Sequence, residues 1–117
     1  KESWLRAEPK AAEALIKAFI EATYYGWKNK DVAKKALAKY IRSDDDEVLE
    51  QGYRDFLEYQ PKDFRPSLAG IQAAIDELAE VNPKVKDVKP ADVVNLTLIE
   101  QLERSGFMAE MKQRYSR

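Results

Sequence analysis

Apolar residues recur every three or four positions through most of this chain, the spacing that places them on one face of an α-helix. The first such stripe follows Pro9, a residue favoured in the first turn of a helix, and predicts a helix over about 9–28. Its apolar positions are Ala12, Leu15, Ile16, Phe19, Ile20, Thr23 and Trp27. A second stripe over 30–41 follows Asn29, which is a favoured helix cap. The two segments predict a tight helical hairpin.

Capping residues and prolines divide the rest of the chain into further helices. Ser43 precedes four acidic residues that suit the positive end of a helix dipole, so a helix is expected to begin there. A Pro-Ser pair opens the next helix, an Asn-Pro pair closes it, and a last region starts with a short turn at Pro90 and continues after Asn95. The predicted helices are about 9–28, 30–41, 44–59, 66–81, 90–105 and 107–115.

These segments predict an all-α fold of five to six short helices in an orthogonal or antiparallel array, forming a single helical domain over 1–117. Gly52 lies inside a predicted helix, where it costs ~1 kcal/mol relative to alanine. Such a glycine favours a close approach by a neighbouring element. The stretch 84–89 alternates valine with charged residues, but it is short, and an ordered loop is favoured over a strand. The last segment, 107–115, either docks or frays.

Composition and charge narrow the possible partners. Hydrophobic residues make up 44% and charged residues 35% of the 117 positions, which is typical of a folded domain. Lys and Arg number 20 against 21 Asp and Glu, and this balance argues against a nucleic-acid partner, which needs a cationic surface. No apolar run approaches the roughly 20 residues that cross a bilayer, so no membrane insertion is expected. The amino end also lacks the apolar stretch of a signal peptide.

The residue types available exclude much of the usual catalytic chemistry. The chain has no cysteine and no histidine, which removes thiolate nucleophiles, histidine-activated nucleophiles and ordinary zinc sites. The run Asp44–Glu47 lacks the spaced ligands of a calcium loop, and helix capping is the favoured interpretation. The acid pairs Asp76–Glu77 and Glu100–Glu103 are interpreted as solvated faces. We therefore expect no catalytic residue, no metal ligand, no cofactor and no enzymatic activity.

Aromatic residues form the remaining candidate site. They are Tyr24, Tyr25, Trp27, Tyr53, Phe56 and Tyr59. Such rings can line a ligand platform, because they combine a large contact area with polar tips. Their helical spacing favours packing in the core or between subunits.

Positions spread over nearly the whole chain resemble one known family. In the first half these are Pro9, Ala12, Leu15–Ala22, Asn29–Ala33, Leu37, Tyr40, Ile41, Asp46 and Glu47. In the second half they are Pro90–Asn95, Leu98, Leu102 and Ser105–Phe107. Together they are similar to the carboxyl-terminal helical region of periplasmic substrate-binding proteins of the nitrate/sulfonate/taurine and thiamine-precursor-like family of ABC transporters.

The resemblance implies a parent protein in which two α/β lobes close on a small-molecule solute and deliver it to an ABC permease from the periplasm. This chain would be a fragment of that protein, or a module derived from it, and would contribute scaffold. The upstream strands and most cleft-lining loops lie outside the sequence, and Asn95 stands where an aspartate is expected. The ligand-binding residues are therefore unknown.

Missing lobes would leave apolar helix faces without a cover. We therefore expect self-association, as a symmetric homodimer through the helices that carry tyrosine and tryptophan. The alternative function is a stand-alone helical module that binds another protein through an apolar groove. A reading frame with strands and a secretory signal upstream would favour the transporter function.

Overall fold

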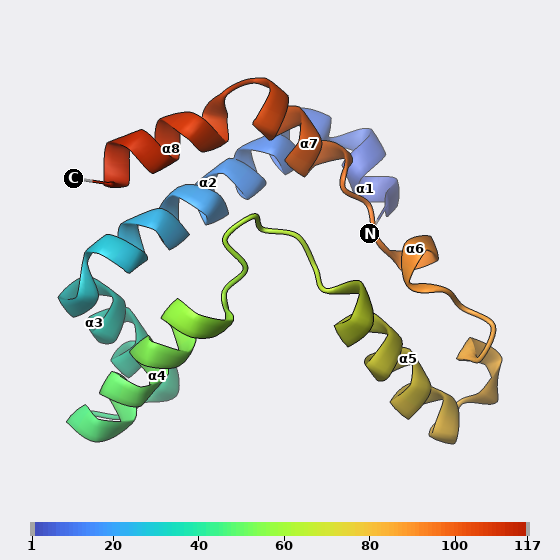
Figure 1. Ribbon diagram of the computed structural model, residues 1–117, viewed down its shortest axis with the longest axis horizontal. Coiled ribbons are helices and arrows are strands. Elements are labelled where there is room, and N and C mark those ends of the chain that lie inside the picture. The colour runs from blue at the N-terminus through green and yellow to red at the C-terminus, as the bar shows by residue number, and fades with distance from the viewer. Residues whose placement is uncertain (1, 117) are drawn as a thin grey trace. The chain divides into compact units, whose positions relative to one another are not determined.

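The computed structural model describes residues 2–116, and within them the chain folds into eight α-helices and one short 3-10 helix, with no strand (Figure 1). The predicted all-α class is confirmed. The helices are α1 (Glu2–Ala7), α2 (Pro9–Lys28), α3 (Lys30–Ile41), α4 (Asp46–Tyr59), α5 (Leu68–Val81), η1 (Pro83–Val85), α6 (Pro90–Val93), α7 (Thr97–Arg104) and α8 (Phe107–Tyr115). The segments 9–28, 30–41 and 107–115 have the predicted bounds.

The number of helices exceeds the expected five to six for two reasons. An unpredicted helix, α1, precedes Pro9 and joins α2 through a hydrogen bond from the Glu8 amide to the Trp4 carbonyl, 2.8 Å. The predicted helix over 90–105 is in fact two, because Val94 adopts an extended backbone after α6. The Asn95 side chain then accepts from the Thr97 amide at 3.0 Å and starts α7.

Two predicted caps are corrected. α4 begins at Asp46 rather than at 44, because Asp45 is its cap and accepts from the amides of Glu47 and Val48. Ser43 instead accepts from the Asp45 amide, at 3.3 Å. The Asn29 side chain does not cap α3; its amide donates to the Tyr25 carbonyl at 2.8 Å and completes the end of α2.

The chain divides into two compact units. Unit 1 consists of Lys1–Gln60 with Leu102–Arg117, and unit 2 of Pro61–Gln101, so that the boundary falls within α7. A single domain over 1–117 stays a prediction.

In unit 1, α3 and α4 form an antiparallel pair (Figure 1). A Cβ atom added at Gly52 would lie 2.5 Å from a methyl carbon of Leu37, which confirms the predicted close packing at this glycine. Lys30 and Lys34 of α3 form ion pairs with Glu50 of α4 along the same contact, at 2.6 and 3.3 Å. Apolar packing and ion pairs therefore hold the hairpin together.

The carboxyl-terminal helix of unit 1 docks on α2 (Figure 1). Met111 of α8 and Ile20 of α2 are both buried almost completely. Above them, Arg114 pairs with Glu21 at 2.7 Å, and the Tyr115 hydroxyl donates to the same carboxylate at 3.0 Å. The pKa of the Tyr115 phenol is raised by its burial and by Glu21. Of the two alternatives for this segment, docking is therefore the one observed.

Unit 2 contains α5, η1, α6 and the first part of α7. Ser67 caps α5 by accepting from the Gly70 amide at 3.1 Å, and Asn82 begins η1 by accepting from the Lys84 amide at 3.3 Å. The stretch 84–89 contains the end of η1 and turns, so the predicted loop is confirmed. Ile75 alone is buried among the residues of this unit.

Candidate functional site

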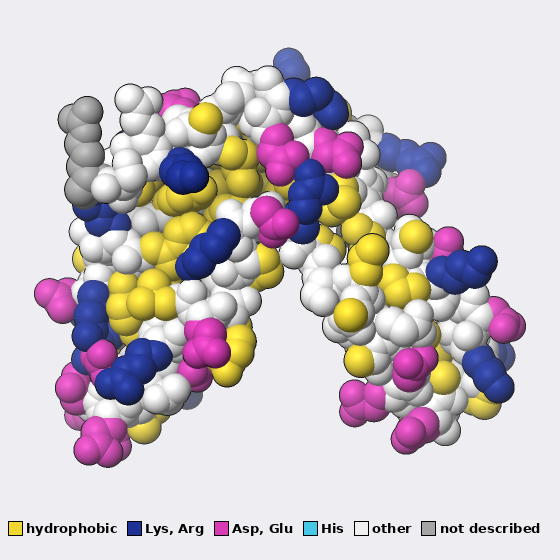
Figure 2. All heavy atoms as spheres, in the orientation of Figure 1, with side chains coloured by type: hydrophobic (Ala, Val, Ile, Leu, Met, Phe, Trp, Pro, Cys, Tyr) yellow, Lys and Arg dark blue, Asp and Glu magenta, His cyan; other side chains and the backbone are white. Residues whose placement is uncertain are grey.

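The main candidate site is an open apolar cavity of about 720 Å³ within unit 1, between α2, α3 and α4. We call it the apolar groove. Its lining residues are Phe19, Ala22, Thr23, Ala33, Ala36, Leu37, Tyr40, Gly52, Tyr53, Phe56 and Gln60. None of them carries a charge, and a cavity of this size and apolar character is typical of a binding site. In Figure 2, hydrophobic side chains gather over the region of α2 and α4.

Helix α2 supplies one wall of the groove. The neighbouring helices cover only part of its apolar stripe. Ile20 and Thr23 are buried, while Leu15 and Phe19 remain 59% and 55% exposed. The Thr23 hydroxyl donates to the Phe19 carbonyl at 2.8 Å. The Thr23 hydroxyl hydrogen is thus used within the helix. The side chains of this wall therefore present mainly carbon atoms to the groove.

Helix α3 forms the opposite wall, and no residue of this helix is buried. Its predicted apolar stripe includes Val32, Leu37 and Ile41, of which Leu37 alone is half-buried. Tyr40 stands at the last turn of the helix with 90% of its surface exposed. An amphipathic helix normally buries its apolar face, whereas α3 leaves much of its own exposed.

Helix α4 forms the floor. The buried Tyr53 hydroxyl donates to the Trp27 carbonyl at 3.0 Å, near the end of α2. Beside it, Phe56 packs so closely on α2 that a Cβ atom at Gly26 would lie 3.2 Å from its ring. These contacts leave no room for a side chain at Gly26 without movement of the ring. They fix α4 against α2 and so define the depth of the groove.

The charged residues of the α3–α4 pair lie outside the groove lining. Lys30 donates to the Glu50 carboxylate and, with Lys34, holds the pKa of Glu50 below its ordinary value. The Asp46 carboxylate accepts from Lys34 and, together with Glu50, raises the pKa of that lysine. Both shifts favour the charged forms near neutral pH. The ion pairs therefore stabilise the hairpin that carries the groove while leaving the groove itself uncharged.

The six aromatic residues singled out from the sequence separate into different environments. Tyr24 contacts Trp27 with ring centres 5.0 Å apart, and Phe56 contacts both Trp27 and Tyr53 at 6.3 Å. Tyr25 meets Tyr115 of α8 at 6.1 Å, whereas Tyr59 is 71% exposed. The rings thus pack mainly between helices, as their spacing predicts, and two of them reach the groove. Sequence reasoning missed Phe19 and Tyr40 as site residues, because their stripe positions indicated a covered face.

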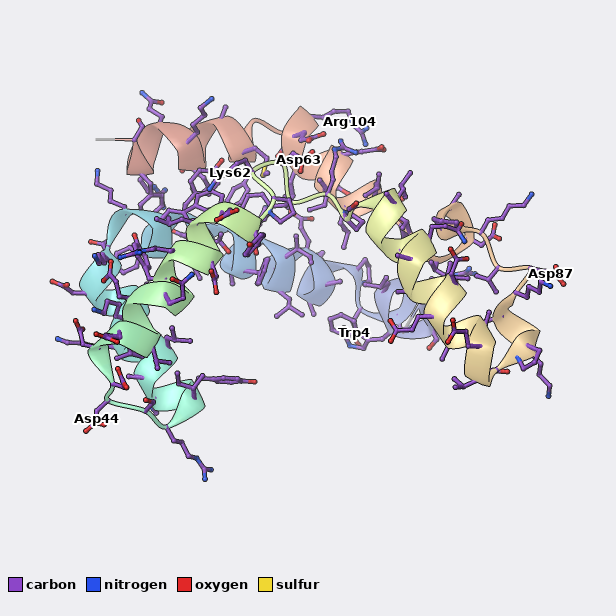
Figure 3. All side chains as sticks on the ribbon, turned by 60° about the horizontal axis from the view of Figure 1, so that its bottom comes forward. Trp4, Asp44, Lys62, Asp63, Asp87 and Arg104 are labelled. Carbon is purple, nitrogen blue, oxygen red and sulfur yellow. The ribbon has the colours of Figure 1, made fainter. Side chains whose placement is uncertain are left out.

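The acidic residues do not converge. Within residues 2–116, no three acidic side chains are grouped so that they could hold a metal ion. Asp45 caps α4, and Asp44 lies at the turn between α3 and α4, away from the groove (Figure 3). Asp76 accepts from Gln72 of the same helix at 2.8 Å, and Glu100 lies 4.0 Å from Arg65. These carboxylates therefore serve caps and surface pairs.

Unit 2 has a smaller recess of its own, of mixed polarity. It has a volume of about 450 Å³, lies along α5 and is lined by Ala74, Leu78 and Val81 together with Glu77 and Glu80. In contrast to the apolar groove, it carries two negative charges.

No family model, curated protein or solved structure matches this chain. The resemblance to solute-binding proteins therefore stays a prediction. Within the part of the chain that the structure describes, no helix has both the length and the apolar character needed to cross a membrane. The function has to be argued from the apolar groove.

Proposed function

We propose that this chain is the carboxyl-terminal helical part of a solute-binding protein for ABC import. In this proposal it supplies scaffold, and the parent protein binds the solute and meets the permease in the periplasm. The α/β lobes of the parent would cover the apolar faces that the helices leave open.

The observation that carries the proposal is the uncovered wall formed by α3. This helix of 12 residues packs on α4 but has no buried residue, so part of its apolar stripe is left uncovered. Helical stability comes mostly from packing of the apolar face, and a further covering element would therefore stabilise α3. Phe19 across the groove is exposed in the same way, and so is Leu15, one turn earlier on α2. Apolar surface left open by a domain marks the place where another element packs.

A second candidate function uses the same groove. An amphipathic helix that lies in an apolar groove is a common mode of protein recognition, and a stand-alone interaction module would need no further domain. The uncharged lining suits such a ligand. In this case the partner would be another protein, and no solute would be bound.

The test is to express the product of the complete reading frame that contains this chain and to measure its binding of nitrate, taurine, alkanesulfonates and pyrimidines by calorimetry. The proposal predicts saturable binding of one of these solutes by a protein with substantial strand content. A reading frame without strand-forming segments, together with no solute binding, would favour the interaction module.

A substitution in the groove tests the scaffold role separately. Phe19→Asp is expected to destabilise the full-length protein by about 2 kcal/mol or more, because a covering lobe would bury the new charge. In the isolated chain the same side chain is half exposed, so its own stability should change much less. Gln113→Asp, at an exposed position of α8, is the control. Equal effects of Phe19→Asp in both proteins would contradict a covering role for the lobes.

A further inference from the structure

A second recess of unit 1 lies where the carboxyl-terminal ends of α2 and α8 meet. Its volume is about 290 Å³. Small-molecule sites combine aromatic or apolar walls with a few polar groups, in a volume of roughly 300–1,000 Å³. This recess has that composition and a volume close to the lower end of the range. We call it the aromatic recess, and its lining residues are Tyr24, Trp27, Lys28, Lys112, Tyr115 and Ser116.

Three aromatic rings form the wall of the recess. Tyr24 meets Trp27 edge to face, with ring centres 5.0 Å apart, and stacks on Tyr115 of α8 at 6.4 Å. The Tyr115 hydroxyl donates to the Glu21 carboxylate at 3.0 Å, which ties this ring to α2. Aromatic rings favour stacked or edge contacts with other rings. The wall therefore suits a ligand that contains a planar ring.

The two lysines of the recess have no counter-ion. Within residues 2–116, neither Lys28 nor Lys112 forms an ion pair. The acids of α2 and α8 are all paired with other cations, as Glu13–Lys17, Glu21–Arg114 and Glu110–Arg114. The helix dipoles account for a lysine near each helix end. They do not account for two lysines that line the same recess while no acid lines it.

From these features we infer that the aromatic recess binds a small aromatic carboxylate. The rings contact the planar part of the ligand, and the ammonium groups of Lys28 and Lys112 bind its carboxylate. Each ammonium carries a full positive charge and three hydrogen-bond donors. The Ser116 hydroxyl donates to the Gln113 carbonyl at 3.1 Å, so the lysines supply the donors for the carboxylate. The volume limits the ligand to about one ring with its anionic group.

This inference goes beyond the proposed scaffold role, which assigns no ligand to the chain itself. In the proposed import protein the solute lies between the α/β lobes, outside this sequence. The aromatic recess is instead formed by α2, α8 and the adjoining Ser116. It shares no lining residue with the apolar groove. A ligand in the recess would therefore leave both the groove and the solute cleft open.

Benzoate is the probe, titrated into the full 117-residue chain and followed by heteronuclear NMR of the amide and indole N–H groups. We expect saturable shifts confined to the ends of α2 and α8, including the Trp27 indole. Benzamide keeps the ring without the charge, and acetate keeps the charge without the ring. Each should bind roughly fivefold more weakly than benzoate or worse, because each lacks one of the two kinds of contact.

The lysines supply the matched variants. Lys28→Gln combined with Lys112→Gln should weaken benzoate binding roughly fivefold or more, because the ligand loses both of its cationic partners. Lys10→Gln combined with Lys39→Gln removes the same charge at exposed positions outside the recess. This control should bind benzoate within roughly twofold of the wild type, because distant surface charges are screened by salt. Circular dichroism checks that the variants stay folded, which the exposure of all four lysines favours.

Several results would overturn the inference. One is the absence of saturable shifts up to the solubility limit of benzoate. Another is binding of benzamide or acetate as tight as that of benzoate, which would show that the charge or the rings contribute nothing. Equal benzoate affinity in the two double variants, or shifts centred on the apolar groove, would also exclude the recess. The solute-binding test uses the complete reading frame and other ligands, so the two proposals fail separately.

Discussion

Arg42 ends α3 with a left-handed backbone, at φ 56° and ψ 45°. A residue with a Cβ atom is strained in this region, whereas glycine adopts it readily. Arg42→Gly is therefore expected to stabilise the chain by roughly 0.5–1 kcal/mol, as measured by urea unfolding. Arg42→Ala removes the same charge but keeps the Cβ atom, and it should give no gain. A gain of equal size in both variants would show that the charge, and not the backbone, is responsible.

At the residue scale, the sequence predicts Gly52 better than the caps. Gly52 stands inside a helix, where a glycine favours a close approach by a neighbour, and the Leu37 methyl carbon is found in that place. Ser43 and Asn29 were assigned as caps, but several polar residues stand side by side at each junction. The side chain that accepts from the first backbone amides of the next helix depends on the residue at which the preceding helix ends. The sequence alone does not specify that residue.

At the scale of elements, the bounds of α2 and α3 followed from Pro9 and from the stripe positions. The short α1 and the break between α6 and α7 did not, because helices of four to eight residues carry too few apolar positions for a period to be recognised. The apolar groove was not predictable as a site. A stripe indicates which face of a helix is apolar, but not whether anything covers it.

Two glycines inside helices should respond differently to the same substitution. In α5, a Cβ atom at Gly70 would meet Ser67 at an ordinary 3.5 Å, so Gly70→Ala should gain up to ~1 kcal/mol from helix propensity. In α4, a Cβ atom at Gly52 would meet Leu37 at 2.5 Å, and Leu37 would have to rotate. Gly52→Ala should therefore gain less or lose stability. Urea unfolding monitored by circular dichroism compares the two, and an equal gain at both sites would contradict the close contact of α3 with α4.

The α3–α4 pair should weaken in acid. The folded protein lowers the pKa of Glu50, chiefly through the Lys30 hydrogen bond, so the carboxylate stabilises the fold above its ordinary value of 4.5. This contribution is lost as the pH falls below 4.5 and through the depressed folded-state pKa. We expect the wild type to lose more stability between pH 7 and pH 3 than Glu50→Gln does, as measured by urea midpoints. Glu58→Gln, at an exposed position of the same helix, is the control, and a wild-type-like acid response in Glu50→Gln would refute the assignment.

At the scale of the whole molecule, buried residues are distributed unequally. Unit 2 buries Ile75 alone among its residues, while unit 1 contains the buried side chains of Ile20, Leu49, Tyr53, Leu102 and Met111. A unit as short as Pro61–Gln101 has little apolar area with which to offset its conformational entropy. The two units should therefore differ in local stability.

Hydrogen exchange provides the measurement. The central amides of α5 are expected to exchange faster than those of α2 around Ile20, because local opening of unit 2 exposes little apolar surface. Ile75→Ala should speed exchange in α5 further and leave α2 nearly unchanged. Equal protection of the two helices would mean that the units unfold together.

The corner between α2 and α3 consists of one residue, Asn29. Its backbone amide and its side chain both donate to the Tyr25 carbonyl, at 2.9 and 2.8 Å, while its own carbonyl accepts from Ala33 at 3.0 Å. So short a corner gives α2 and α3 little freedom to swing apart. An arriving partner thus meets walls already at their final spacing and loses little entropy in ordering them. Inserting residues into this corner should shorten the lifetime of a complex with the partner, while the helical content of α2 and α3 changes little.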